Sequence, residues 1–441
     1  MRMPKFAWQP RLSLSCPFRF LRRNPFGGRV VQNLHKLGHA CALIIVAMLA
    51  IAIPLLAQQS GRSGGPTFLT EWSSFTQLFD TSVDHDKIVG ASVLMVHDGR
   101  VVARHEHGLA DRATGQPVTE RTIFHYGSIT KTLTAIAIMQ LRDRGWLTLD
   151  DSVTQYIPEL RQIHNPYSSM DSITIRMLLS HSAGFQNPTW PYKQGKPWEP
   201  FEPTTWEQLV AMMPYQEISF KPGSRFSYSN PAFIYLARIV EKLTGDSWET
   251  YVQKNILAPL DLTRSYFGVT PYYLSADRSH NYTLTPEQNG TESIRDNGAD
   301  FDPGITIPNG GWNAPLDDLA TYLAFLTKAT HGDAATERRY DTVLKHSTLE
   351  EMWKPLYPTD ITKTTPDDLE SMGLSFFVVR TGRTELIGHT GSQAGFLAFF
   401  YLNPENGKAV MAAFNTDSDP PARGPDTAVQ IIRKAALKLI E

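Results

Sequence analysis

The pattern of apolar and polar positions predicts strands near both ends of the chain and helices between them. Alternating residues over 91–96 and 101–105 flank the triplet His97-Asp98-Gly99, which is typical of a β-hairpin. Near the other end, short apolar or alternating runs indicate four more strands, followed by a closing helix. These strands are expected at 374–379, 385–387, 397–402 and 410–414, and the helix at 427–440.

Between these strands the pattern changes to helical spacing. Residues 128–144 are apolar on nearly every side of a helix, as expected for a centrally buried helix, and Gly145 is a natural stop. An amphipathic pattern over 232–243 predicts another helix that ends at Gly245. The section 280–311 is rich in Asn, Gly and Asp and is expected to form surface loops.

This order of elements predicts an α+β fold. Strands at both ends of the chain favour one antiparallel β-sheet built from both and flanked by helices, with a helical lobe inserted over roughly 150–330. We find no internal repeat. Residues 75–441 are expected to form this domain, and residues 58–74, which include three glycines and a proline, a linker before it.

Residues 1–57 differ in composition from the rest of the chain. They contain eight Lys or Arg residues and no Asp or Glu, and they end in an apolar run over 40–57. A basic flank before an apolar run of about 18 residues predicts an export signal or an uncleaved membrane anchor. Ala57 suits a cleavage site, but Leu55 stands where a small residue is preferred, so both interpretations stay open. An organelle transit segment is a third. We expect an exported protein of the periplasm or cell envelope.

Charge and cysteine content exclude several functions for the remaining domain. Residues 58–441 contain 34 basic and 44 acidic residues, a formal net charge of −10. An acidic domain disfavours nucleic-acid binding, which depends on basic patches. Both cysteines, Cys16 and Cys41, lie in the N-terminal segment, so the domain has no disulfide, thiol nucleophile or cysteine metal site. We expect neither a cofactor nor a metal.

The candidate nucleophile is Ser128 in the run Ser128-Ile129-Thr130-Lys131. Residues three apart share a helix face, so Lys131 can reach the Ser128 hydroxyl. A helix N-terminus also offers free N–H groups and a positive field where an oxyanion would form. The alternative, in which Ser128 is a helix cap and Lys131 faces solvent, suits a surface helix better than this apolar one.

Two further motifs follow in chain order: Tyr228-Ser229-Asn230, after the Lys221-Pro222-Gly223 turn, and His389-Thr390-Gly391, followed by Ser392. Each has a competitor elsewhere. Tyr401-Leu402-Asn403 repeats the first spacing, but strand alternation explains it. Arg380-Thr381-Gly382 resembles the second and is more simply a hairpin turn between two strands.

Three histidines are weaker candidates. His181, at the end of a predicted helix, could be a catalytic base, but a structural hydrogen bond explains it more simply. His105 and His107 occupy alternate positions of a strand, as a metal pair does, and without further ligands of matching spacing they are interpreted as surface residues. Residues 75–441 lack a Gly-x-Ser-x-Gly elbow and a phosphate-binding glycine motif, which disfavours α/β-hydrolases and nucleotide-binding folds.

In the order and setting of these motifs the chain resembles the serine β-lactamase and penicillin-binding-protein superfamily. The match is best with the class C-like branch, which includes D-Ala-D-Ala carboxypeptidases, D-aminopeptidases and esterases, and it covers most of residues 75–440. The resemblance implies an α+β fold in which a helical lobe faces an antiparallel sheet across a cleft.

The resemblance also implies roles for individual residues. Ser128 would be acylated, Lys131 would accept its proton, and Tyr228 would pass a proton to the leaving group. Asn230 would orient the substrate and the lysine, and Thr390 and Gly391 would line the docking strand. The backbone N–H groups of Ser128 and Ser392 would form the oxyanion hole.

His389 departs from the family pattern, because β-lactamases usually carry a lysine there. A histidine is only partly charged near neutrality, so we expect weaker binding of a substrate carboxylate.

The sequence therefore predicts a serine hydrolase acting on an ester or amide of a small molecule or peptide, without choosing among ester, D-amino-acid peptide and β-lactam. The alternative is a slowly acylated or non-hydrolytic receptor for penicillin or cell-wall peptides. Membrane contact through 40–57 is possible, and the sequence does not indicate the oligomeric state.

Overall fold

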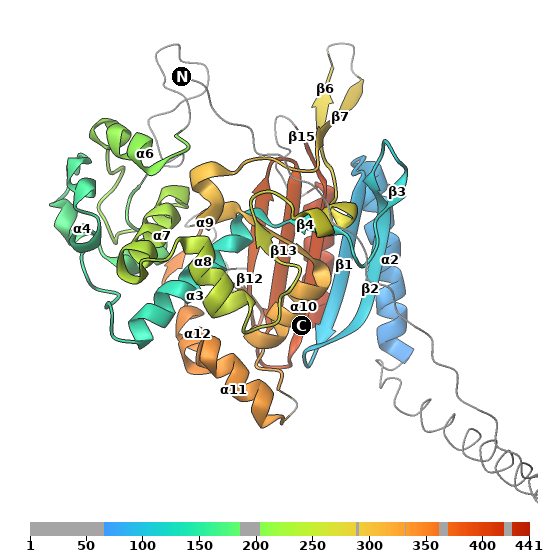
Figure 1. Cartoon of the computed structure of the whole chain (residues 1–441). Coiled ribbons are helices and arrows are strands. Elements are labelled where there is room, and N and C mark those ends of the chain that lie inside the picture. The colour runs from blue at the N-terminus through green and yellow to red at the C-terminus, as the bar shows by residue number, and fades with distance from the viewer. Residues whose placement is uncertain (1–65, 186–202, 288–290, 331, 361–368, 419–425) are drawn as a thin grey trace, which may run out of the picture. The chain divides into compact units, whose positions relative to one another are not determined.

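A nine-stranded antiparallel sheet forms the centre of the domain (Figure 1). The computed structural model describes residues 66–185, 203–287, 291–330, 332–360, 369–418 and 426–441. The strand order is β3-β2-β1-β14-β13-β12-β11-β10-β9. These strands are β1 (Gly90–His97), β2 (Arg100–Asp111), β3 (Gln116–Pro117), β9 (Tyr357–Pro358), β10 (Glu370–Met372), β11 (Phe377–Thr381), β12 (Thr384–Gln393), β13 (Phe396–Asn403) and β14 (Lys408–Phe414).

The sheet joins the two ends of the described chain, as the sequence predicts. β1 pairs with β14 along its length, with Ala91 opposite Phe414. The β1–β2 hairpin turns at Asp98 and Gly99, both with positive φ. The strand predicted at 374–379 lies slightly later, as β11, and the one predicted at 385–387 is part of the longer β12.

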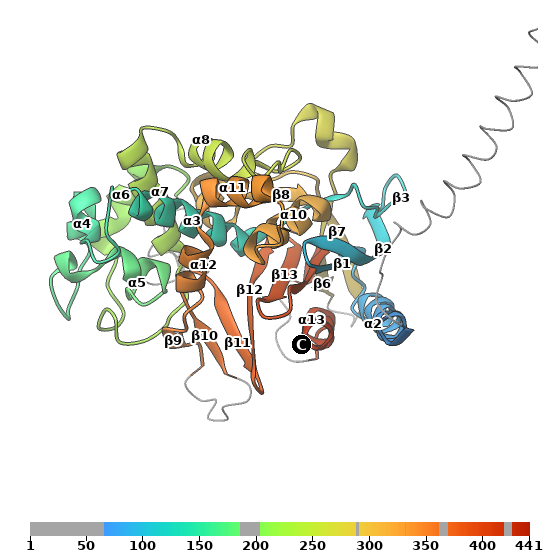
Figure 2. The same cartoon turned by 90° about the horizontal axis from the view of Figure 1, so that it is seen from below.

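Helices cover both faces of the sheet. In Figure 2, α2 and α13 lie on one face, while α10 packs against β1 and β14 from the other. Both predicted central helices are present, as α3 and α7, and the closing helix is α13. The helices are α2 (Pro66–His85), α3 (Thr130–Asp143), α4 (Val153–Tyr156), α5 (Ile175–Leu179), α6 (Trp206–Met212), α7 (Asn230–Thr244), α8 (Trp248–Val252), α9 (Ile307–Gly310), α10 (Leu316–Leu326), α11 (Ala334–Val343), α12 (His346–Met352) and α13 (Ala428–Ile440).

Two apolar cores hold these layers together. The larger one surrounds α3, which is buried on every side from Thr130 to Leu141. The smaller one lies between the sheet and the pair α2 and α13, where Phe79 and Phe414 stack with ring centroids 5.9 Å apart. Because β1, β13 and β14 are covered on both faces, they are apolar along most of their length.

Two predicted segments differ from the structure. The linker expected over 58–74 is helical from Pro66 onward, because Phe68, Trp72 and Phe75 recur at helical spacing and pack against the smaller core. The section 280–311 is not only loops: it contains the hairpin of β6 (Asn281–Pro286) and β7 (Glu292–Gly298), and also α9. The side chains of β7 are largely exposed and polar, so the sequence lacks the apolar alternation that would predict a strand there.

Short strands complete the fold. β15 (Thr416–Ser418) adds to the β6–β7 hairpin, and β4 (Ile123–His125), β8 (Trp312–Pro315) and β5 (Tyr266–Phe267) form a third sheet. In the described ranges no helix combines the length and the hydrophobicity that crossing a bilayer requires. The apolar run 40–57, expected to be a signal or an anchor, and both cysteines lie outside the described residues.

Candidate active site

The Ser–Lys pair lies at the start of the buried central helix. Ser128 is in a 3₁₀ turn (Gly127–Ile129) that continues directly into α3. Lys131 has no exposed surface, and its Nζ donates to Ser128 Oγ over 2.9 Å. A second hydrogen bond, 2.8 Å long, runs from Nζ to the carbonyl oxygen of Asn309 in α9. Lys131 is therefore directed at Ser128 and not at solvent.

Burial determines the protonation of Lys131. Desolvation holds the pKa of its amine well below the ordinary value. Among the described residues no carboxylate raises the pKa of Lys131 to offset this shift. A buried lysine without a counter-ion favours the neutral amine, which can accept a proton. The pair thus combines a hydroxyl with a nearby base.

Tyr228 approaches the same hydroxyl from the loop before α7. Its phenol shares a hydrogen bond with Ser128, and Lys131 Nζ lies 5.0 Å from the centre of its ring. Burial raises the pKa of Tyr228 above its ordinary value, and the hydrogen bond with Ser128 partly opposes that shift. The phenol therefore keeps its proton at neutral pH and can act as a donor.

His181 supports this tyrosine. The two rings stack with centroids 4.4 Å apart and planes 25° from parallel. The backbone N–H of Ser229 donates to His181 Nδ1 over 3.0 Å, and burial holds the pKa of the imidazole well below its ordinary value. The structural hydrogen bond predicted for His181 is present, and the residue positions Tyr228. Asn230 follows as the first residue of α7, after the cap that Ser229 provides.

The third motif lies on β12, which packs against the Ser128 turn. Glycines line this contact from both sides: a β-carbon on Gly127 would lie 2.8 Å from the backbone nitrogen of Ser392. One on Gly391 would collide with the Tyr126 carbonyl oxygen and lie 3.2 Å from the nitrogen of Ser128. Residues with a side chain could not approach so closely. The contact brings the backbones of Ser128 and Ser392 together.

The cleft in front of these motifs has a volume of about 440 Å³. Pairing between β11 and β12 ends at Gly388, so within the described chain β12 beyond that point pairs with β13 alone. A neighbouring cavity of about 620 Å³ is larger, but none of the eight predicted site residues lines it. Six of the eight line the cleft, namely Ser128, Tyr228, Asn230, Thr390, Gly391 and Ser392.

The remaining two predicted residues, Lys131 and His389, lie behind the cleft wall. His389 is fully buried, with its ring centroid 5.0 Å from that of Phe377. Its Nδ1 donates to the Thr390 carbonyl oxygen over 2.6 Å. Burial lowers the pKa of His389 to about 3. The ring is therefore neutral at pH 7 and presents no charge to the cleft.

Comparison with known proteins identifies the family. A family model described as Beta-lactamase matches residues 75–433, which is most of the chain. The chain belongs to the beta-lactamase family. Among solved structures, the chain resembles the octameric penicillin-binding protein homologue from Pyrococcus abyssi, with a TM-score of 0.66 and 26% sequence identity. The similarity covers 83% of this chain and 77% of the homologue.

Two curated relatives show how far the similarity extends. Protein flp of Staphylococcus aureus (strain COL) is 23% identical over 348 residues, which are 78% of this chain and 64% of the relative. Esterase EstB of Burkholderia gladioli is 31% identical over 195 residues, which are 42% of this chain and 48% of the esterase. The similarity of this beta-lactamase-family chain thus spans less than two thirds of the length of either relative.

Asn309 is a residue of this beta-lactamase-family site that sequence reasoning missed. Its backbone carbonyl accepts from Lys131 and so helps to fix the position of the amine. Every residue type offers such a carbonyl, so the sequence carries no signal for this contact. The prediction of surface loops over 280–311 also pointed away from it, whereas Asn309 is buried in α9, against α3.

Proposed function

We propose that this protein is a serine hydrolase that cleaves esters or amides through an acyl-enzyme. The observation that carries the proposal is the buried Lys131 amine, 2.9 Å from Ser128 Oγ and without a carboxylate partner in the described chain. Ser128 attacks the substrate carbonyl and forms the new C–O bond, while its proton passes to Lys131. The N–H groups of Ser128 and Ser392 stabilise the oxyanion.

The pKa shifts support this assignment of the proton transfers. Lys131 is the acceptor because desolvation lowers its pKa, whereas the raised pKa of Tyr228 keeps the phenol protonated, so it supplies the proton to the leaving group. The bond to the leaving group then breaks, and the proton on Lys131 restores the phenol. Water attacks the acyl-enzyme, releases the acid and regenerates the Ser128 hydroxyl.

The electrostatics of the cleft favour substrates without a carboxylate beside the scissile bond. His389 is neutral and buried, so the triplet on β12 offers no fixed cation. Arg433, which also lines the cleft, is paired with Glu370. We therefore expect neutral short-chain esters and neutral amides to react faster than β-lactams, whose carboxylate would find no matched charge.

The similarity to a named esterase favours hydrolysis over the receptor alternative. Part of the chain is 31% identical to Esterase EstB. A receptor would keep its acyl group, whereas a hydrolase releases it to water. The volume of the cleft in front of Ser128, about 440 Å³, leaves room for a small substrate and for the water that completes the reaction.

The test is to treat the purified protein with a chromogenic short-chain ester, a penicillin and a fluorophosphonate, and to follow its intact mass. We expect rapid ester turnover, a stable fluorophosphonate adduct on Ser128, and no adduct on Ser128→Ala. An ester or penicillin adduct that persists for hours would favour the receptor. Equal ester turnover by Ser128→Ala would overturn the assignment of the nucleophile.

Residues 1–57 support export as the cellular setting of this hydrolase. A basic flank and an apolar run over 40–57 fit an export signal, or an anchor that tethers the domain to the cell envelope. Cell fractionation and N-terminal sequencing test this setting. Cytoplasmic recovery with residues 1–57 intact would contradict it, and membrane recovery with them intact would indicate an anchor.

A further inference from the structure

Two histidines and two aspartates meet where α2 lies along β2, outside the cleft. His105 and His107 occupy alternate positions of β2, so both project from the same face of the sheet. On α2, Asp80 and Asp84 are four residues apart and share one side of the helix. The sequence indicates the histidine pair but not its partners, because the aspartates come from a different element.

The distances place three potential metal ligands around one point. Asp80 Oδ1 lies 2.6 Å from His105 Nε2 and 3.0 Å from His107 Nδ1. One ligand atom from each of the three residues lies within 4.8 Å of the other two. Zinc–ligand bonds of about 2.0–2.2 Å separate tetrahedral ligands by about 3.3 Å, so shifts of less than an ångström would admit an ion. Each imidazole is about a quarter exposed, which leaves a path for the ion.

The hydrogen-bonding capacity of His107 points to a cation in this cluster. Its Nδ1 faces Asp80, and its Nε2 lies 2.7 Å from Asp84 Oδ1. A neutral imidazole has a single N–H and can donate to only one of these carboxylates. The other ring nitrogen would then bring a lone pair close to a carboxylate oxygen, and a metal ion or a proton between them would remove that repulsion.

We propose that Asp80, His105 and His107 bind one divalent cation of the zinc class, with Asp84 orienting His107. A metal on Nδ1 of His107 leaves its Nε2–H to donate to Asp84, the carboxylate–histidine–metal arrangement that commonly fixes a ligating imidazole. The ring of His105 is held by an edge contact with Phe79, whose centroid lies 5.7 Å away. Two imidazoles and one carboxylate suit zinc, nickel or copper, and not magnesium.

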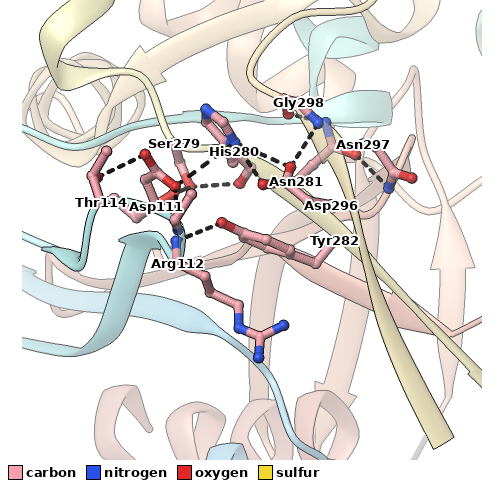
Figure 3. A network of polar contacts seen from close by, with 12 residues as sticks. Asp111, Arg112, Thr114, Ser279, His280, Asn281, Tyr282, Asp296, Asn297 and Gly298 are labelled. Atoms are coloured by element: carbon pink, nitrogen blue, oxygen red, sulfur yellow. Dashed lines mark hydrogen bonds and ion pairs between the residues drawn. The ribbon is translucent and has the colours of Figure 1, made fainter.

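A second mixed cluster in the described chain lacks these properties. Asp111, His280 and Asp296 lie together at the base of the β6–β7 hairpin (Figure 3). There the carboxylates are already occupied: Asp111 accepts from Ala113 N and Thr114 Oγ1, and Asp296 accepts from Gly298 N. A single histidine and satisfied oxygens make this a structural network, and it serves as the matched control.

The bound ion would fasten α2 to the sheet. α2 contributes Phe75 and Phe79 to the smaller core, and the ion would add a cross-link between this helix and β2. Since a ligand that binds only the folded state stabilises it, the melting temperature should rise with the zinc concentration. The site lies outside the cleft, so this gain does not depend on the proposed hydrolysis.

The experiment is isothermal titration of the chelator-treated full-length protein with zinc chloride, followed by cobalt absorption spectroscopy. Cys16 and Cys41 can also bind zinc, so the measured quantity is the difference between the parent and its variants. We expect His105→Gln and His107→Gln each to lose one bound ion per chain, and Asp84→Asn to weaken that binding by about 10–100-fold. His280→Gln should bind as the parent does.

Two outcomes would overturn the proposal. The parent and the His105→Gln/His107→Gln double variant could bind equal numbers of ions, in which case the cluster shares protons only. Alternatively, His280→Gln could lose the ion while the other variants keep it, which would assign it to the second cluster. Circular dichroism of each variant before titration separates lost binding from lost folding, and Asp84→Asn removes no proposed ligand.

Discussion

The site around Ser128 and the cluster on α2 and β2 both contain histidines, but in opposite surroundings. Behind the cleft wall, His389 and Lys131 have no exposed surface and no carboxylate partner in the described chain, so burial favours their neutral forms. On the outer face, His107 is partly exposed and lies between two carboxylates. A buried polar group without a counter-charge suits proton transfer, whereas imidazoles beside carboxylates suit a cation. The surroundings, and not the residue type, decide the chemistry.

The largest expected effect is that of Lys131→Met. Without the buried amine, Ser128 loses the proton acceptor proposed for it, so we expect kcat for an ester to fall by about 10²–10⁴-fold. The melting temperature should change little, since methionine removes the cost of burying the amine. Lys408→Met, at a half-buried lysine at the start of β14, is the control and should keep full activity. If Lys131→Met were as active as the parent, the buried amine would not be the proton acceptor, and the contrast between the buried site and the outer cluster would fail.

Gly391→Ala tests the close contact between β12 and the Ser128 turn. The added methyl collides with the Tyr126 carbonyl oxygen, so the strand must move. Since a displacement of about 1 Å near reacting groups costs roughly 10²-fold, we expect a loss of that size in kcat/KM. Gly382→Ala, in the β11–β12 turn with open space around it, should lose stability and keep activity. Equal activity of the two variants would contradict the proposed oxyanion geometry.

Acid should destabilise the protein through its buried histidines. Burial lowers the pKa of His389 to about 3, below its value in the unfolded chain, so the unfolded state takes up protons first as the pH falls. Stability is therefore complete above about pH 6.5 and is lost as the pH falls towards 3. Between pH 7 and 5 this histidine should lower the free energy of unfolding by about 2 kcal/mol. In urea unfolding, His389→Gln should therefore lose less free energy over this pH range than the parent does. Between pH 7 and 8 the free energy of unfolding should change with pH by the same amount in the parent and in the variant.

The smallest effect is expected in the outer cluster without metal. In chelating buffer, Asp84→Asn removes a largely exposed carboxylate, and such surface pairs contribute only about 0–1 kcal/mol. The free energy of unfolding should therefore change by no more than that, while ester hydrolysis stays the same. Added zinc should then stabilise the parent more than the variant. A large loss in chelating buffer would show that the cluster is a structural ion pair.

Much of the fold and of the site could be predicted, because both depend largely on patterns between residues that are close together in the sequence. The period of apolar residues revealed α3 and the strands, and the spacing of Ser128 and Lys131 follows from helix geometry. The β6–β7 hairpin was missed because its exposed side chains are polar, so alternation gave no signal. Asn309 was missed because it acts through its backbone. Asp80 and His105 meet only through tertiary packing, which no local pattern reports.

The pairing of β1 with β14 affects how the protein can be made. A ribosome releases β1 and the Ser128 turn long before it releases the strand that must lie beside β1. Until Phe414 emerges, the nascent chain holds an unpaired apolar strand edge, which is a site for misassociation. The same delay keeps the unfinished polypeptide inactive, because β12 and its glycines arrive almost as late. We expect hydrolytic activity to report on completed synthesis.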